Sequence, residues 1–217
     1  MKLLAVDTAL GACSVALLDG EQTLAHIFEP MDRGHAERLA PMVEEAMWGM
    51  EFSALTRLAV TIGPGTFTGQ RVGLAFMRGL RLALKIPLAG TTTLDVMAMA
   101  AAAETGLSKA AAIHDARRNE AYLLLKDGPD VLQQPVVLPF GQAVDRIRAF
   151  GSCALAGTGA AAAFESLGAG YRLSSVRQPD ALWVARQARA MPEPKTVPGP
   201  LYLRAPDAKL PGGKALV

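Results

Sequence analysis

The sequence predicts an α/β protein of two lobes, each built from the same order of strands and helices. Asp7 and Asp19 close two apolar, strand-like runs in the first half, and Asp115 and Asp127 do the same in the second, with the same separation of 12 residues. Glycine follows the second aspartate of each pair, which is a strong signal for a β-hairpin. Because order and spacing both recur, duplication of a β-β-β-α-β-α unit is a better interpretation than coincidence.

The elements of the first lobe follow from apolar spacing along residues 1–105. Short apolar runs bounded by turn residues predict strands, which we expect at 3–6, 13–18, 23–28, 58–62 and 87–90. Apolar residues three and four apart predict helices, which we expect at 35–48, 71–84 and 94–104.

The second lobe is expected over residues 106–190, with strands at 111–114, 121–126 and 153–156. Residues 191–217 differ in composition, because the four prolines at 192, 194, 198 and 200 cannot continue a helix and predict an extended tail. The apolar segment at 201–204 is expected to dock back on a lobe, and Pro211-Gly212-Gly213 predicts a loose end.

The composition is that of an ordinary globular chain with a real core. Its 217 residues carry a net charge of +2, which gives no electrostatic case for binding nucleic acid unaided. Cys13 and Cys153 lie in apolar runs, where buried free thiols are the simplest interpretation and indicate a reducing compartment. Asp7 interrupts the first apolar run too early for a signal peptide, and no stretch approaches the roughly 20 apolar residues of a membrane span. We therefore expect a cytoplasmic protein without membrane contact.

A glycine-rich loop over residues 63–69 joins a buried strand to a helix. Backbone N–H groups and the helix dipole at such a junction can hold an anion. The loop lacks the ending of a Walker loop, since Gln70 and Arg71 stand where Lys and Ser or Thr would. Two interpretations stay open, a phosphate site or a tight turn needed for close packing of strand and helix. The candidate vestigial phosphate or nucleotide loop comprises Asp7, Thr8, Gly63, Pro64, Gly65, Thr66 and Gly69.

Two lobes that face a cleft form the architecture of the actin, Hsp70 and sugar-kinase class, an analogy at the level of fold. Actin-like ATPases place an acidic residue where Asp7 ends the first strand, and a glycine follows closely so that the chain can wrap a phosphate. Here the next glycine is Gly11, and Asp115-Ala116-Arg117 at the matching place in the second lobe has none. A retained carboxylate without these glycines predicts a fold that was kept and a phosphotransfer site that was lost.

The histidine and cysteine pattern does not predict a metal site. His26, His35 and His114 do not pair at metal-binding spacing, and the two cysteines form no C-x-x-C. Residues 157–162 fit the G-x-G-x-x-A dinucleotide pattern, with Asp180 near the expected acidic spacing, but a single match of this kind is weak. A turn in the second lobe is the alternative.

Two helices carry more apolar surface than internal packing would use. The helix at 71–84 is apolar around most of its circumference, which is typical of burial on two sides, and the helix at 35–48 adds more. The surplus predicts a surface for a partner. The candidate partner-binding residues are Leu39, Met42, Val43, Ala46, Arg71, Leu74, Ala75, Arg78, Gly79 and Leu82.

The segment at 63–73 resembles the TsaB (YeaZ) family of bacterial tRNA threonylcarbamoyladenosine synthesis. The first lobe matches specifically, and residues 130–190 match in outline. The supporting pieces are Leu4-Ala5-Val6-Asp7-Thr8, Cys13-Ser14-Val15-Ala16-Leu17, Asp115-Ala116-Arg117 with Glu120-Ala121-Tyr122, and Leu201-Tyr202-Leu203-Arg204.

The resemblance implies a non-catalytic partner of the paralogue TsaD, which moves a threonylcarbamoyl group onto the adenosine beside the tRNA anticodon. TsaD carries a metal-binding H-x-x-x-H pair where this chain has Thr93 and Met97. The family further implies pairing with TsaD through the first-lobe helices, engagement of the ATPase TsaE, and contact with tRNA only through the complex.

On the same basis we expect no cofactor on the isolated chain, and ATP or ADP only in the complex. Whether the free protein is a homodimer stays open. Two alternatives remain for the function, a glycopeptidase-like metalloprotease of the M22 type and a small actin-fold kinase or ATPase.

Overall fold

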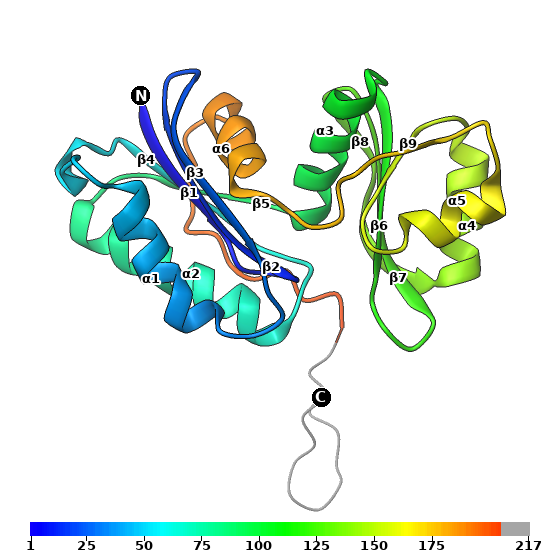
Figure 1. Ribbon diagram of the computed structural model, residues 1–217, viewed down its shortest axis with the longest axis horizontal. Coiled ribbons are helices and arrows are strands. Elements are labelled where there is room, and N and C mark those ends of the chain that lie inside the picture. Colours follow the sequence, from blue (N-terminus) through cyan, green and yellow to red (C-terminus); the bar gives the residue numbers. More distant parts are fainter. Residues whose placement is uncertain (205–217) are drawn as a thin grey trace, which may run out of the picture.

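The computed structural model describes residues 1–204 and contains two five-stranded sheets with helices on their faces (Figure 1). The first half runs β1 (Lys2–Asp7), β2 (Ala12–Asp19), β3 (Gln22–Pro30), α1 (His35–Ala46), η1 (Phe52–Ala54), β4 (Arg57–Thr61), α2 (Phe67–Leu84), β5 (Leu88–Thr91) and α3 (Thr93–Thr105). The second half runs β6 (Lys109–Asp115), β7 (Glu120–Asp127), β8 (Asp130–Pro139), α4 (Phe140–Phe150), β9 (Ala154–Ala156), α5 (Ala160–Leu167), β10 (Arg172–Leu173) and α6 (Ala181–Ala190).

The two sheets have the same topology. The first has the order β3-β2-β1-β4-β5, and the second has the order β8-β7-β6-β9-β10. In each sheet the first strand pairs antiparallel with the second and parallel with the fourth. The duplicated α/β unit expected from the paired Asp-Gly turns is therefore confirmed.

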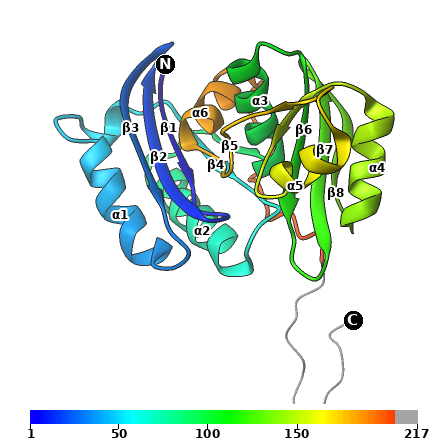
Figure 2. The ribbon, with the colours of Figure 1, turned by 45° about the vertical axis from the view of Figure 1, so that its right-hand side comes forward.

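The helices and sheets stack in five layers, which Figures 1 and 2 show from two directions. Successive side chains of a strand point to opposite faces of its sheet. Leu4 and Val6 of β1 therefore pack with α1 and α2, whereas Leu3 and Ala5 pack with α6 on the other face. The second sheet has α3 on its inner face and α4 with α5 on its outer face. Helices α3 and α6 thus lie between the two sheets.

Helix α6 differs from the lobe assignment made on sequence. We expected residues 106–190 to form the second lobe, but α6 buries Ala181, Val184 and Ala185 against the first sheet. The Asp180 carboxylate caps the helix by accepting from the Leu182 N–H. An amphipathic helix needs an apolar face to cover, and its sequence does not tell which of two sheets supplies that face.

A chain of buried polar contacts crosses the middle of the molecule. The Lys126 ammonium of β7 donates to the Asp95 carboxylate of α3 at 2.6 Å, and this ion pair is nearly buried. The other Asp95 oxygen accepts from the Gln187 amide of α6, whose oxygen accepts from the Thr91 hydroxyl of β5. These four side chains connect the second sheet to the first through both middle helices.

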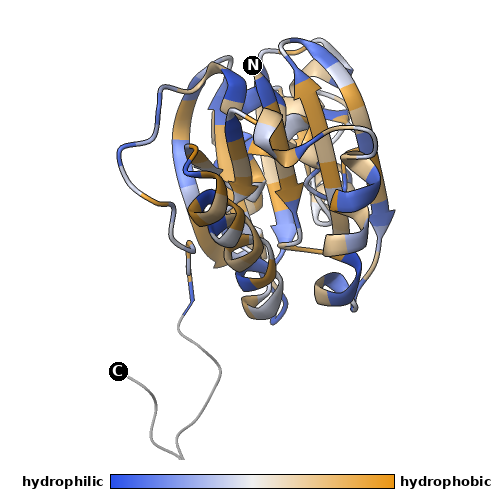
Figure 3. Ribbon diagram, turned by 90° about the vertical axis from the view of Figure 1, so that its left-hand side faces the viewer, coloured by the Kyte–Doolittle hydropathy of each residue, from blue (hydrophilic) through white to orange (hydrophobic). Residues whose placement is uncertain are grey.

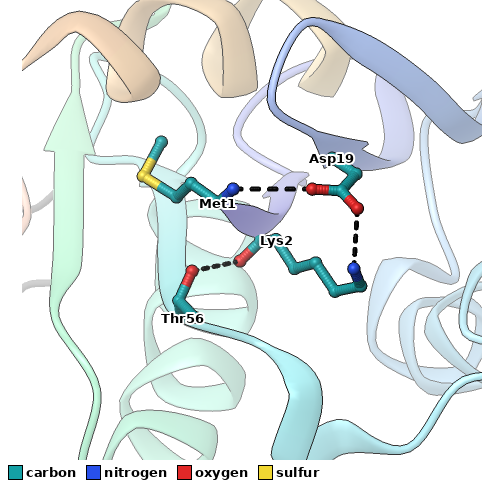
Figure 4. Close-up of polar contacts among 4 residues, drawn as sticks. All are labelled: Met1, Lys2, Asp19 and Thr56. Atoms are coloured by element: carbon teal, nitrogen blue, oxygen red, sulfur yellow. Dashed lines mark hydrogen bonds and ion pairs between the residues drawn. The ribbon is translucent and has the colours of Figure 1, made fainter.

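The start of the chain is fastened to the first hairpin turn (Figure 4). Asp19 accepts from the Met1 amino group at 3.4 Å and from the Lys2 ammonium at 2.6 Å. The Thr56 hydroxyl donates to the Lys2 carbonyl oxygen, which ties β1 to the segment before β4. These contacts anchor the first residues of β1, the central strand of its sheet.

The proline-rich tail runs extended and returns to both lobes. Pro198 accepts through its carbonyl oxygen from Arg78 of α2, and the Leu201 N–H donates to the Ile62 carbonyl oxygen. Arg204 then reaches the second lobe, where it donates to the Ala116 carbonyl oxygen. The docked segment expected at 201–204 is therefore present, whereas Pro211-Gly212-Gly213 lies outside the described residues.

Among residues 1–204, no helix is both long and apolar enough to cross a membrane. Cys13 and Cys153 are both buried and unpaired, as expected, and burial raises the pKa of each thiol to about 12.

Candidate functional site: the interlobe cleft and the α1–α2 face

The glycine-rich loop is shaped by close packing of α2 on the turn after β1. A Cβ atom at Gly65 would lie 2.3 Å from the Ala9 carbonyl oxygen, and one at Gly69 would lie 2.2 Å from that of Thr8. The Thr8 hydroxyl donates to the Gly69 carbonyl oxygen and accepts from the Gly73 N–H, both at hydrogen-bond distance. Glycine at these positions is therefore explained by packing alone, which favours the tight-turn interpretation of the loop.

Helix α2 begins at Phe67, four residues earlier than expected. Thr66 caps it, since its hydroxyl oxygen accepts from the Gly69 N–H at 3.1 Å. The buried Thr93 hydroxyl of α3 stabilises the loop by donating to the Pro64 carbonyl oxygen at 2.7 Å. The periodicity of apolar residues did not extend into this glycine- and threonine-rich first turn, so the sequence placed the start too late.

Asp7 is sealed beneath this loop. Its side chain is fully buried, with one oxygen accepting from the Thr61 hydroxyl and the Ala9 N–H, and the other without a partner in residues 1–204. Burial raises the pKa of Asp7 to about 7, although the hydrogen bond from Thr61 opposes the shift. A carboxyl group in this state is poorly placed to reach a ligand in the cleft.

The matching turn of the second lobe is open. Asp115 is exposed, and its carboxylate accepts from the Arg117 N–H at 2.8 Å. Arg117, Arg118 and Asn119 all have left-handed backbone conformations, with φ between 55° and 63°. Such a conformation is uncommon for residues other than glycine and needs support from its surroundings. Arg204 supplies part of it through its hydrogen bond to the Ala116 carbonyl oxygen and its ion pair with Glu120.

A cavity of about 450 Å³ lies between these parts of the two lobes. The glycine-rich loop and the first turn of α2 form one wall, the turn after β6 forms another, and the terminal segment closes a third. The lining residues are Leu10, Pro64, Gly65, Thr66, Phe67, Gln70, Asp115, Ala116, Arg117, Tyr122, Leu201, Tyr202, Leu203 and Arg204. Asp7 does not line it.

Half of the expected partner-binding residues prove to be core. These five pack against the first sheet and are at most 5% exposed, so they do not face a partner. They are Leu39, Met42, Val43, Ala46 and Leu74. Their apolar spacing was read correctly, but it marked the face that covers the sheet.

The remaining expected residues lie on the outer side of α2, where Arg71, Ala75, Arg78, Gly79 and Leu82 are exposed. Leu82 is 75% exposed. The neighbouring helix α1 ends at Ala46, and the side chain of Trp48, in the turn that follows it, is 90% exposed. We call the exposed side of these two helices, with Trp48, the α1–α2 face; Figure 3 views this side of the molecule.

The other candidate residues take structural positions. His26 pairs with Asp180 at 2.8 Å, an interaction that raises the pKa of His26, and His35 contacts the Leu10 carbonyl oxygen. His114 is buried, which lowers its pKa to about 4. No group of three or more His, Cys, Asp or Glu side chains within residues 1–204 is arranged to hold a metal ion.

The dinucleotide-like segment is a packing turn. A Cβ atom at Gly157 would lie 2.2 Å from the Ile113 carbonyl oxygen, and the Thr158 hydroxyl accepts from the Asp115 N–H. Asp180 caps α6 on the first sheet, so it does not accompany this turn. Thr93 and Met97 are both fully buried.

The contacts among Phe67, Arg71 and Tyr202 at the cleft were not predicted from the sequence. Tyr202 stacks on Phe67 with ring centroids 5.5 Å apart, and the Arg71 guanidinium lies 3.5 Å from the Phe67 ring. Arg71 also donates to the Tyr202 hydroxyl at 3.0 Å. No local pattern predicts contacts between residues so distant in the chain. The expected docking of residues 201–204 on a lobe was the one indication that Tyr202 would contact the first lobe or the second.

Most of the chain is similar to proteins of a known family. A family model described as TsaD, tRNA N6-adenosine threonylcarbamoyltransferase, matches residues 22–177. The chain is 40% identical over 124 residues to the tRNA threonylcarbamoyladenosine biosynthesis protein TsaB of Escherichia coli (strain K12). That match covers 56% of this chain and 53% of the E. coli protein, so the matched part spans about half the length of that curated relative.

Solved structures extend the similarity to the fold. A crystal structure of a protein from Pseudomonas aeruginosa, described as similar to the peptidase YeaZ, superposes with a TM-score of 0.78 at 31% identity. It covers 94% of this chain and 99% of that one. The ethanolamine utilization protein EutJ of Carboxydothermus hydrogenoformans covers 85% of this chain and 89% of its own, with a TM-score of 0.53 at 10% identity, and so shows the fold alone. The two-lobed actin-like architecture expected from the sequence is confirmed.

Proposed function

Because the chain belongs to the TsaB (YeaZ) family, we propose that it acts in tRNA threonylcarbamoyladenosine synthesis as the non-catalytic partner of a TsaD-type transferase. The partner is a larger paralogue, and the assembly also engages a TsaE-type ATPase. The observation that carries the proposal is the α1–α2 face, where the large apolar side chains of Trp48 and Leu82 are 90% and 75% exposed in the described chain.

The chemistry of the α1–α2 face suits a helix-to-helix interface. Ala75 and Gly79 lie one turn apart on the exposed side of α2, and a Cβ atom at Gly79 would meet no other atom within 4 Å. Small residues at a crossing point let two helices approach closely. Trp48 then provides a residue type that often dominates binding free energy at interfaces, and Leu82 adds exposed apolar surface.

The non-catalytic part of the proposal is supported by Asp7. Phosphoryl transfer in actin-like enzymes uses a carboxylate that faces the phosphate and its metal ion. Here the corresponding carboxyl is fully buried under glycines that serve packing, and burial raises its pKa to about 7. A kinase or ATPase would need such a carboxylate in the cleft, which Asp7 does not line. A metalloprotease would need a cluster of metal-binding side chains, and none is found among residues 1–204.

The sharpest test is Ala75→Glu, which places a charge on the exposed side of α2, within the α1–α2 face. An unpaired charge in a dry interface costs several kcal/mol, so association with the TsaD-type protein should weaken by ~100-fold or more. Because Ala75 is exposed, the monomer should stay folded. Affinity is measured by titrating the purified partner, and threonylcarbamoyladenosine is measured in tRNA from cells that carry only the variant.

Ala162→Glu is the matched control, since Ala162 is exposed on α5 at the far side of the second lobe. It should leave pairing unchanged. Normal pairing of the Ala75 variant would refute this interface. ATP turnover by the isolated chain at about 1 s⁻¹, an ordinary enzyme rate, would refute the non-catalytic role.

A further inference from the structure

We propose that the interlobe cavity is an RNA contact site, which takes an unpaired nucleotide of the tRNA held by the assembly. This inference rests on the proposed function and adds a direct RNA contact made by this chain. It is carried by the side chains that the fold gathers around the cavity from five separate segments, which are the turn after β1, the glycine-rich loop with α2, the turn after β6, β7 and the tail.

The cavity offers stacking surfaces for a base. Phe67, Tyr122 and Tyr202 all line it, and Phe67 and Tyr202 keep 44% and 41% of their surface exposed although they stack on each other. Unpaired bases in protein–RNA complexes stack on aromatic rings and on arginine planes. A cavity of about 450 Å³ is also within the size range of sites that enclose a ligand of nucleotide size.

Two arginines line the cavity, and one of them is available for the phosphate of a bound nucleotide. Arg117 lines the cavity, is exposed, and its guanidinium forms no ion pair within residues 1–204. The left-handed turn at 117–119 and its hydrogen bond to Asp115 hold the arginine at this edge. Arg204 also lines the cavity, but it is committed to Glu120 and to backbone carbonyl oxygens. Arg117 is therefore the cation left to meet a phosphate.

Unused hydrogen-bonding groups complete the site. Gln70 lines the cavity, is 2% exposed, and its amide oxygen has no partner in the described chain. A buried amide oxygen without a partner is rare, because it costs free energy unless a ligand or water satisfies it. The N–H group of Phe67, a lining residue in the first turn of α2, likewise has no acceptor among residues 1–204. Together these groups can read a base edge and hold an anion.

An RNA fits these observations better than a free nucleotide. The glycines that would wrap a polyphosphate are absent, and Asp7, which would face its metal ion, is sealed. The aromatic and cationic groups are instead spread along an exposed rim, as in sites where one nucleotide of a longer strand docks.

The test measures binding of a labelled tRNA anticodon stem–loop to the full chain and to its complex with the TsaD-type partner. Arg117→Glu should weaken binding about tenfold and lower the slope of log affinity against log salt by about one. Tyr202→Ala should weaken it by about 10- to 100-fold through lost stacking. Arg146→Glu, an exposed arginine on α4, is the matched control and should bind as the natural chain does.

Three outcomes would overturn the proposal. One is equal affinity of the Arg117 and Arg146 variants for the stem–loop. Another is equal binding of the stem–loop and of a duplex without unpaired nucleotides. The third is displacement of the RNA by AMP at concentrations comparable to the RNA, which would make the cavity a mononucleotide site. Pairing with the TsaD-type protein is measured in parallel, so that loss of RNA binding with intact pairing is distinguished from failure of the proposed function.

Discussion

The turns after β1 and after β6 occupy equivalent places in two copies of one unit, but they face opposite environments. In the first, the chain is covered by α2, and the Asp7 carboxyl is fully buried. In the second, Asp115 is exposed and three residues with left-handed backbone carry Arg117 to the edge of the cavity. The two turns therefore differ in role, since the first packs against α2 and the second exposes its side chains at the cavity.

The largest effect is expected from Gly69→Ala, which adds a Cβ atom where α2 packs on the turn after β1. The new Cβ atom would lie 2.2 Å from the Thr8 carbonyl oxygen, so the backbone must move. We expect a loss of about 4 kcal/mol or more in the free energy of unfolding, measured by urea denaturation. Gly79→Ala on the same helix has open space around it and should stabilise by up to about 1 kcal/mol. Similar losses in both variants would contradict the packing role assigned to Gly69.

A second prediction concerns the sealed carboxyl and uses Asp7→Asn. The native pKa of Asp7 is about 7, above the value of 3.8 for an ordinary aspartate. The folded state therefore holds a proton that the unfolded state has released, and stability falls as pH rises from about 4 through 7.

At the usual scale of 1.36 kcal/mol for each pKa unit, this fall amounts to about 4 kcal/mol. The Asn variant cannot ionise. Its free energy of unfolding should therefore change much less between pH 5 and pH 8 than that of the natural chain. Parallel pH profiles for the natural chain and the variant would mean that Asp7 is not sealed.

The smallest effect is expected at the open turn, from Asp115→Ala. The substitution removes the acceptor for the Arg117 N–H, an exposed hydrogen bond of 2.8 Å. Such a bond contributes about 0.5–1 kcal/mol to stability, and thermal unfolding should shift by a few degrees at most. A loss comparable to that of Gly69→Ala would break the contrast between the two turns.

The sequence predicted the fold well because the duplication left a local trace. The Asp-Gly turns marked matching hairpins, and apolar spacing located the strands and helices of the first lobe. It did not reveal where α6 packs or which face of α1 is covered. Leu39 and Met42 carry the correct helical spacing, but spacing shows only that a face is apolar, and not whether a sheet or a partner covers it.

The site was less predictable for a related reason. Arg117 shows no sequence signal for its left-handed backbone, since arginine has no preference for that region. Tyr202 and Phe67 come together only because the tail returns along α2. The Asp7 carboxylate was predicted at the correct strand end, but whether it opens to the cleft depends on how closely α2 packs, which becomes visible only in three dimensions.

The buried contacts between Lys126, Asp95, Gln187 and Thr91 have a mechanical consequence. A protein that closes on a ligand by turning one lobe against the other needs a junction whose contacts can part. Separating Lys126 from Asp95 would leave a charge unpaired in the interior, at a cost of about 3–5 kcal/mol. The two lobes are therefore expected to move as one body. A partner bound to the outer helices of the first sheet would then hold the cavity in a fixed position relative to the partner. The buried contacts that transmit this constraint lie away from both the partner surface and the cavity.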